Sequence, residues 1–140
     1  MRWYRKGRRE EDAHADRFVD NGDGTVTDSL SGLVWQREDD GTERTYAAAE
    51  SYCERLALAG CTDWRLPTKE ELTGLAATGF DGLCSSLPGL QRERYWAASP
   101  PTELQWAENP ERIAYTVDFD PDSANYGQAM TYFRDYSYFV

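Results

Sequence analysis

The alternation of apolar and polar residues divides the chain into short segments that predict both strands and helices. Between residues 17 and 28, β-forming residues flank an Asn-Gly pair at 21–22 and an Asp-Gly pair at 23–24, which predicts a β-hairpin. A further strand is expected at Gly32–Trp35. Residues 1–16 are charged and lack periodicity, so we expect a flexible tail ahead of one domain at 17–140.

Two helices are predicted in the middle of the chain. The first, at 45–59, has apolar residues at helical spacing and is followed by Gly60. The second, at 69–77, begins after Thr68, which stands in the S/T-x-x-E relation to Glu71. In that relation, each side chain satisfies a backbone N–H of the other residue, so the sequence predicts a capped helix.

The second half of the chain predicts strands separated by loops. We expect a loop at 79–94, a strand at 95–99, a polar loop at 101–111, a strand at 113–119 and a last strand at about 130–140. A hairpin, two helices and then strands indicate an α+β fold, in which two helices pack on a mainly antiparallel sheet.

Net charge restricts the kinds of partner that fit this chain. The charge is −10, yet five of the fifteen cations lie in the first nine residues, so residues 10–140 hold ten basic and twenty-five acidic residues, or −15. A body this acidic repels phosphate and sulfate groups, so we expect no nucleic-acid partner. No apolar run approaches the roughly 20 residues of a membrane span.

The compartment stays open at this stage. The N-terminus lacks the apolar segment of a leader peptide. We therefore expect an extracellular or periplasmic protein if a leader was removed, and a cytoplasmic protein otherwise.

Catalysis is not expected. His14 is the only histidine and lies in the predicted tail, so a Ser-His or Cys-His pair within the domain is unavailable. No resident cofactor is expected either.

Two acidic segments are candidates for calcium. Residues 20–24 resemble part of an EF-hand, but the loop positions that must ligate fall on Val19 and Leu30, so a hairpin turn explains this segment better. Asp118, Asp120 and Asp122 point the same way on an extended chain and are a candidate calcium site. The alternative is a solvated strand end.

Cysteines leave two possibilities open. The chain has three cysteines, and Cys61 and Cys84 flank the second predicted helix, so these two are candidates for a disulfide. The alternative is three reduced thiols in a cytosolic protein.

The C-terminal third has the composition of a binding surface. Tyrosine offers a large contact area at small entropic cost, and asparagine adds adaptable hydrogen bonds. Strand alternation predicts that the tyrosines at 132, 136 and 138 share a face with Arg134. Tyr138 and Phe139 are expected in the core, as are Trp35, Trp64 and Trp96. The candidate ligand-binding residues are Trp106, Asn125, Tyr126, Tyr132, Arg134 and Tyr136.

Two motifs carry a family resemblance. Residues 63–72 read D-W-R-L-P-T-K-E-E-L, and residues 17–26 read R-F-V-D-N-G-D-G-T-V. Together they resemble the collagen-like-protein C-terminal (Lcl C-terminal) domain family and, more distantly, the formylglycine-generating enzyme and sulfatase-modifying group. The resemblance covers about residues 17–140. It implies a C-type-lectin-like fold with a long outward-facing loop region.

The favoured hypothesis is a non-enzymatic recognition module that binds a glycan or a protein. The resemblance raises sulfated glycans, but the −15 body favours a neutral glycan or a protein. The alternatives are a structural or accessory subunit of a larger assembly, and a degenerate sulfatase-modifying-type enzyme.

Overall fold

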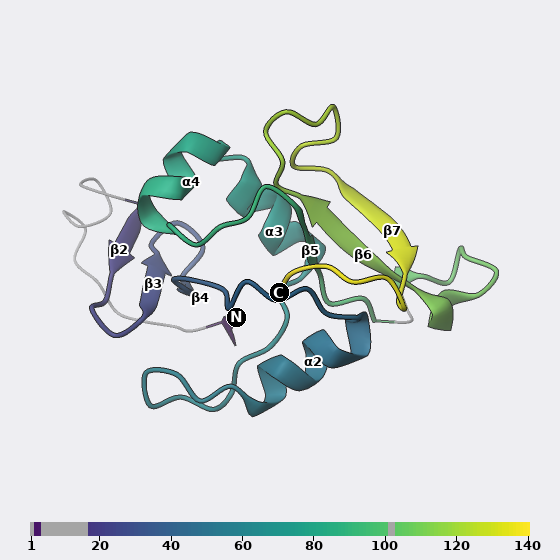
Figure 1. Cartoon of the computed structure of the whole chain (residues 1–140), viewed down its shortest axis with the longest axis horizontal. Helices are drawn as coiled ribbons and strands as arrows, with labels where there is room; N and C mark the ends of the chain where they lie inside the picture. Colours follow the sequence, from purple (N-terminus) through teal and green to yellow (C-terminus); the bar gives the residue numbers. More distant parts are fainter. Residues whose placement is uncertain (1, 4–16, 101–102) are drawn as a thin grey trace.

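The structure is a computed structural model that describes residues 2–3, 17–100 and 103–140 (Figure 1). Within these residues the chain is α+β, with three α-helices and two small antiparallel sheets. The predicted fold class is confirmed at this level, although a single sheet and two helices were expected. No helix among the described residues has the length and apolar character needed to cross a bilayer.

The first sheet has the strand order β1-β4-β3-β2. Its strands are β1 (Arg2–Trp3), β2 (Phe18–Asp20), β3 (Thr25–Asp28) and β4 (Leu33–Gln36). The β2–β3 hairpin confirms the turn predicted from the Asn-Gly and Asp-Gly pairs. Gly22 and Gly24 adopt positive φ angles of 76° and 90°, and the Asn21 amide donates to the Thr25 and Thr27 hydroxyls at 2.9 Å.

The predicted N-terminal tail is partly inside this sheet. Arg2 pairs with Val34 and Trp3 with Leu33, so these two residues form an edge strand instead of a tail. Residues 1 and 4–16 lie outside the described residues, and the tail prediction stands untested there.

The second sheet has the order β5-β6-β7. Its strands are β5 (Arg94–Trp96), β6 (Ile113–Asp118) and β7 (Ala129–Phe133), and the short 3-10 helix η2 (Pro110–Arg112) leads into β6. The predicted last strand at 130–140 is therefore too long. The Tyr136 N–H donates to the Phe133 carbonyl at 3.1 Å, which closes a turn. Beyond this turn, Tyr138 and Phe139 make single bridges with Arg44 and Tyr95.

Helices α2 (Tyr46–Arg55) and α3 (Lys69–Ala76) are the two helices that the sequence predicted, although α2 ends at Arg55 and does not reach residue 59. The capping box at α3 is confirmed: the Thr68 hydroxyl accepts from the Glu71 N–H at 3.1 Å, and the Glu71 carboxylate accepts from the Thr68 N–H at 2.8 Å. Arg65 donates twice to the same carboxylate at 2.9 Å, so the start of α3 is tied to the preceding segment.

Helix α4 (Phe80–Ser86) was missed, since this stretch was predicted as a loop. Phe80, Leu83 and Leu87 are spaced i, i+3 and i+7, and all three are buried. Their burial stabilises a helix that begins at Gly79 without a side-chain cap.

The second sheet separates two hydrophobic clusters, because alternate residues of β6 face opposite sides. Tyr115 and Val117 join the larger cluster with residues of α3 and α4. Ala114 joins the smaller cluster with residues of α2 (Figure 1). Trp35, Trp64 and Trp96 are 1, 4 and 0 % exposed, as predicted for core residues.

Candidate functional site

An open hollow lies beside the end of β7, next to η2, which leads into β6. We call it the aromatic hollow, and it is lined by Arg112, Phe133, Arg134, Asp135 and Tyr136. The turn that closes β7 carries four of these residues, so the hollow is built by the same backbone hydrogen bond that ends the strand.

The rings in the aromatic hollow are exposed and packed against one another. Phe133 is 49 % exposed and Tyr136 is 48 % exposed, and their ring centroids lie 5.7 Å apart at 73°. Tyr132 packs on both Tyr136, at 6.4 Å, and Tyr138, at 5.5 Å. The tyrosines thus meet as predicted, but through the turn after β7, because strand alternation ends at Phe133.

Arg134 is fixed in place by its backbone and side chain. Its N–H donates to the Arg112 carbonyl at 2.9 Å, and its Nε donates to the Ile113 carbonyl at 2.8 Å. The guanidinium lies 4.5 Å from the centroid of the Tyr46 ring, within the range of a cation–π contact. Arg134 is therefore preorganised, whereas Arg112 and Asp135 are exposed polar groups at the rim.

Trp106 lies in the loop before η2 and is 66 % exposed. Its indole N–H donates to the Tyr115 hydroxyl at 3.3 Å, so it stands against β6 on the face that also carries Phe133. The expectation of an exposed Trp106 is confirmed. Figure 1 shows its loop beside the start of β6 and the end of β7.

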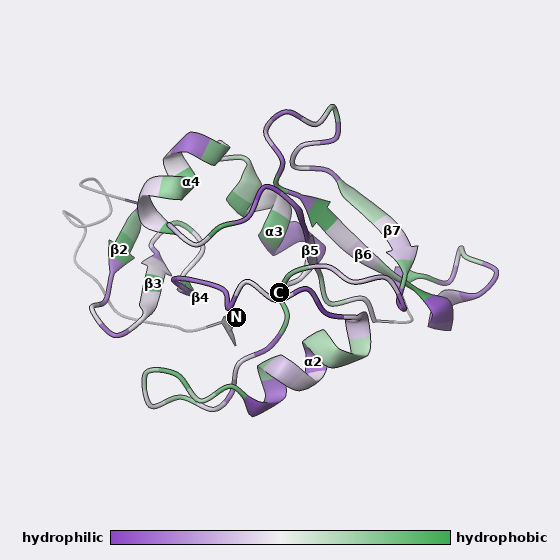
Figure 2. Cartoon of the chain, viewed as in Figure 1, coloured by the Kyte–Doolittle hydropathy of each residue, from purple (hydrophilic) through white to green (hydrophobic). Residues whose placement is uncertain are grey.

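Asn125 and Tyr126 do not belong to this end of the molecule. They lie in the loop that joins β6 to β7, at the opposite end of that hairpin, and this loop is largely hydrophilic (Figure 2). Tyr126 packs edge-on against Phe119, and its hydroxyl donates to the Ala76 carbonyl at 2.9 Å. Burial raises the pKa of Tyr126. The structure therefore splits the predicted binding residues into two groups.

The three aspartates of the candidate calcium site are not brought together. The Asp118 carboxylate accepts from the Asp120 N–H at 2.8 Å and lies 3.5 Å from Arg94, while Asp120 accepts from the Asp122 N–H at 3.0 Å. Asp122 pairs with Arg92 at 3.2 Å. Each carboxylate serves a turn or an ion pair, and the described residues contain no cluster of three potential metal ligands.

Cys61 and Cys84 do not form the disulfide considered from the sequence. Cys61 lies in the turn after α2, where its thiol is 3.8 Å from the Ala59 carbonyl, and Cys84 lies on α4. Figure 1 shows this turn and α4 on opposite sides of the molecule, so the two residues flank α3 in sequence but not in space.

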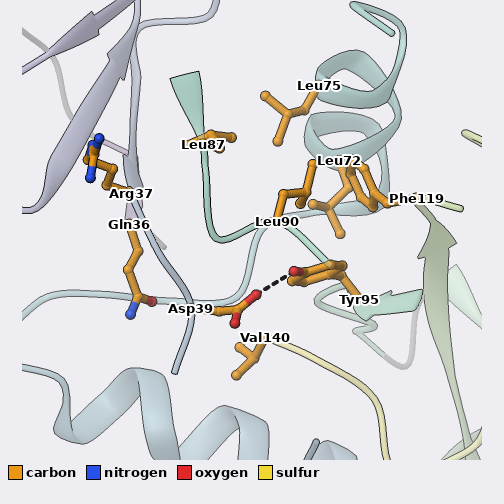
Figure 3. A pocket seen from close by; sticks show the side chains of 10 residues that line it. All are labelled: Gln36, Arg37, Asp39, Leu72, Leu75, Leu87, Leu90, Tyr95, Phe119 and Val140. Atoms are coloured by element: carbon orange, nitrogen blue, oxygen red, sulfur yellow. Dashed lines mark hydrogen bonds between the residues drawn. The ribbon is translucent and has the colours of Figure 1, made fainter. Parts of the chain in front are cut away.

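A second cavity is small and belongs to the core. It has a volume of about 20 Å³, which suits about one water molecule. Figure 3 shows leucines of α3 and of the segment after α4 around it, with Asp39 pointing at Tyr95. The Tyr95 hydroxyl donates to the Asp39 carboxylate, and burial raises the pKa of Tyr95 well above its ordinary value. This contact ties the loop after β4 to the core and leaves no room for a ligand.

Sequence reasoning missed Arg112 and Phe133 as members of the site. Phe133 lies in the same aromatic-rich segment as Tyr132 and Tyr136. The sequence does not show that its ring is exposed, and only the structure does. Arg112 joins only because η2 folds back beside the turn after β7.

Comparison with known proteins gives one family match. The sequence model of a family described as the Lcl C-terminal domain matches residues 24–138. No curated protein and no solved structure matches this chain.

Proposed function

We propose that this chain, which belongs to the Lcl C-terminal domain family, is a non-enzymatic recognition module whose ligand is a neutral glycan or a protein. The observation that carries the proposal is the aromatic hollow. It presents two exposed rings, Phe133 and Tyr136, beside a fixed arginine, and among the described residues Trp106 is the one other large aromatic residue that is exposed.

The chemistry of the hollow suits a sugar ring. Apolar faces of a pyranose pack on rings such as Phe133 and Tyr136, and hydroxyl groups accept from Arg112 or Arg134 and donate to Asp135. The same combination of aromatic residues and arginine is typical of protein hot spots, which keeps a protein ligand as the second candidate.

Charge narrows the ligand class further. The hollow holds two arginines and one aspartate, whereas residues 10–140 carry −15. A polyanionic glycan would contact two cations and face the field of the whole body, which opposes its approach. A neutral or zwitterionic ligand avoids this cost.

The fold of this chain can be assigned more closely than α+β. We assign the chain to the C-type-lectin-like folds and to a distant relationship with the sulfatase-modifying group, on the motifs at 17–26 and 63–72. We propose no enzymatic activity, because the sequence offers a single histidine, His14, and Cys61 and Cys84 lie on opposite sides of the molecule, where they cannot act as a pair. An extracellular or periplasmic location fits a recognition role.

A glycan array probed with the purified chain tests the proposal. Tyr136→Ala removes an exposed ring and should weaken binding by about tenfold or more, equivalent to about 1.4 kcal/mol. Tyr136→Phe keeps the ring and should bind within a few-fold of wild type. Leu30→Ala is the matched control, because Leu30 is 77 % exposed and lies in the turn between β3 and β4.

Metal removal belongs to the same experiment. EDTA should leave binding unchanged, because the aspartates at 118, 120 and 122 are engaged in turns and ion pairs. The glycan proposal fails if no neutral glycan is retained, or if Tyr136→Ala binds as wild type does. A protein ligand would then be favoured if the wild-type chain captured a protein from the native source and Tyr136→Ala did not.

A further inference from the structure

The outer edge of β7 has no strand partner among the described residues. β7 pairs with β6 on one side, and the sheet order β5-β6-β7 leaves its other side as an edge. An edge strand presents unpaired N–H and C=O groups, which are a template for pairing with another strand.

The register identifies which backbone groups point outward. The Arg134 N–H donates to the Arg112 carbonyl and the Asp118 N–H donates to the Gln128 carbonyl, so even-numbered residues of β7 bond to β6. In an antiparallel pair, alternate residues point the other way. The outward groups are the N–H and C=O of Ala129 and Thr131 and the N–H of Phe133, whose carbonyl accepts from Tyr136.

β7 lacks the features that normally protect an edge. Its sequence, A-M-T-Y-F, has no charged residue and no proline. Met130 is 36 % exposed and Phe133 is 49 % exposed, and they lie on opposite faces of the sheet. Apolar surface is therefore available on both faces, next to the free backbone groups.

We propose that the outer edge of β7 pairs with the same edge of a second copy of this chain. The two strands run antiparallel about a two-fold axis at Thr131, which joins the two three-stranded sheets into one of six strands. In this register the Thr131 N–H of each copy donates to the Thr131 carbonyl of the other. Ala129 faces Phe133, and Met130 faces Tyr132, so a small or flexible side chain meets a ring at each pair.

Charge and size agree with a weak, self-complementary contact. The nearest charged residue, Arg134, falls opposite Gln128, so no like charges meet across the edge. A pairing five residues long is short beside the about 20–30 residues per side of a stable interface. We therefore expect a reversible dimer that forms at high protein concentration.

This inference goes beyond ligand binding and stands independently of it. Four of the five residues that line the aromatic hollow lie outside the paired segment, and the exception is Phe133, which lines the hollow and faces Ala129 of the second copy. A dimer would offer two such hollows at opposite ends of the paired strands, which raises avidity for a repeated ligand.

Sedimentation velocity from about 10 μM to about 1 mM tests the pairing. Thr131→Pro removes an outward N–H without removing a bond to β6, and proline is tolerated at such an edge position. Loss of the two Thr131 bonds should weaken association by about tenfold or more. Thr131→Ala keeps the N–H and should dimerise as wild type does. Wild type that stays monomeric throughout, or a proline variant that associates equally well, overturns the proposal.

Amide hydrogen exchange gives a second measurement that needs no variant. At low concentration, the amides of Met130 and Tyr132 should exchange slowly because they bond to β6, while the Thr131 and Phe133 amides exchange fast. Raising the concentration should slow exchange at Thr131 and Phe133 selectively. Exchange that is independent of concentration at both amides would rule out pairing at this edge.

Discussion

Single aspartates explain much of the local backbone of this acidic chain. Several of them accept a hydrogen bond from the N–H two residues ahead, which is the Asx turn. They are Asp20, Asp23, Asp28, Asp39, Asp40, Asp118 and Asp120. The aspartates of both acidic segments, 20–24 and 118–122, therefore shape backbone turns.

Asp28 is the aspartate whose replacement should cost most. Its side chain is 1 % exposed and accepts twice from Arg17, at 2.8 and 2.9 Å. Asp28→Asn removes the charge from these bonds and should lower the free energy of unfolding by roughly 1–3 kcal/mol, measured by urea denaturation at pH 7. Asp23→Asn, at an exposed turn position, should cost less and serves as the control.

The same residue makes stability depend on pH. Burial alone would raise the pKa of Asp28, but hydrogen bonds from Arg17 and Ser31 outweigh it and hold the pKa below its ordinary value of 3.8. Since the folded pKa is the lower one, the stabilisation is complete above pH 3.8 and is lost as pH falls through the folded pKa. The melting temperature of wild type should fall more steeply below pH 4 than that of Asp28→Asn. If the melting temperatures of wild type and Asp28→Asn fell equally steeply below pH 4, Asp28 would not have this role.

At the scale of elements, the two predicted helices differ in how firmly they are capped. Thr68 and Glu71 satisfy each other's backbone groups at 3.1 and 2.8 Å, whereas Thr45 reaches the Ala48 N–H only at 3.4 Å. Thr68→Ala should therefore lower the free energy of unfolding by about 1–2 kcal/mol, and Thr45→Ala by less. Urea denaturation of both variants measures the difference. Equal costs would show that the reciprocal bond at α3 adds nothing.

Elements that rest on local chemistry could be predicted from the sequence. The hairpin needs only the Asn-Gly and Asp-Gly pairs, and α3 needs only Thr68 and Glu71, since these contacts form within a few residues. Helix α4 has glycine and serine in its interior and no side-chain cap, so its stability comes from burying Phe80 and Leu83. Burial of that kind depends on distant segments, which a local pattern does not reveal.

The candidate site was partly predicted for the same reason. Arg134 and Tyr136 line the aromatic hollow, Tyr132 packs on Tyr136, and Trp106 is exposed and donates to the Tyr115 hydroxyl. Tyr126 was grouped with them because it is near in sequence, but the β6–β7 hairpin carries it to the opposite end, where it bonds to Ala76. Only the strand register, which pairs Ile113 with Phe133, separates the two groups.

At the scale of the whole molecule, charge decides how copies meet. Each chain carries −10, so two copies repel one another, while the β7 edges proposed to pair are uncharged. The Debye length falls from about 30 Å at 0.01 M salt to about 3 Å at 1 M, so salt should screen the repulsion and strengthen the dimer.

Sedimentation velocity of the whole chain at fixed concentration, in about 0.02 M and about 0.5 M sodium chloride, measures this effect. The dimer fraction should rise with salt, and Thr131→Pro should show a lower dimer fraction than wild type at both salt concentrations. A fall in the dimer fraction would mean that opposite charges drive association. The five cations in the first nine residues would then be the source, binding the acidic body of a second copy. That contact would survive Thr131→Pro. Varying both the salt concentration and residue 131 therefore distinguishes pairing of uncharged strands from attraction between charged segments.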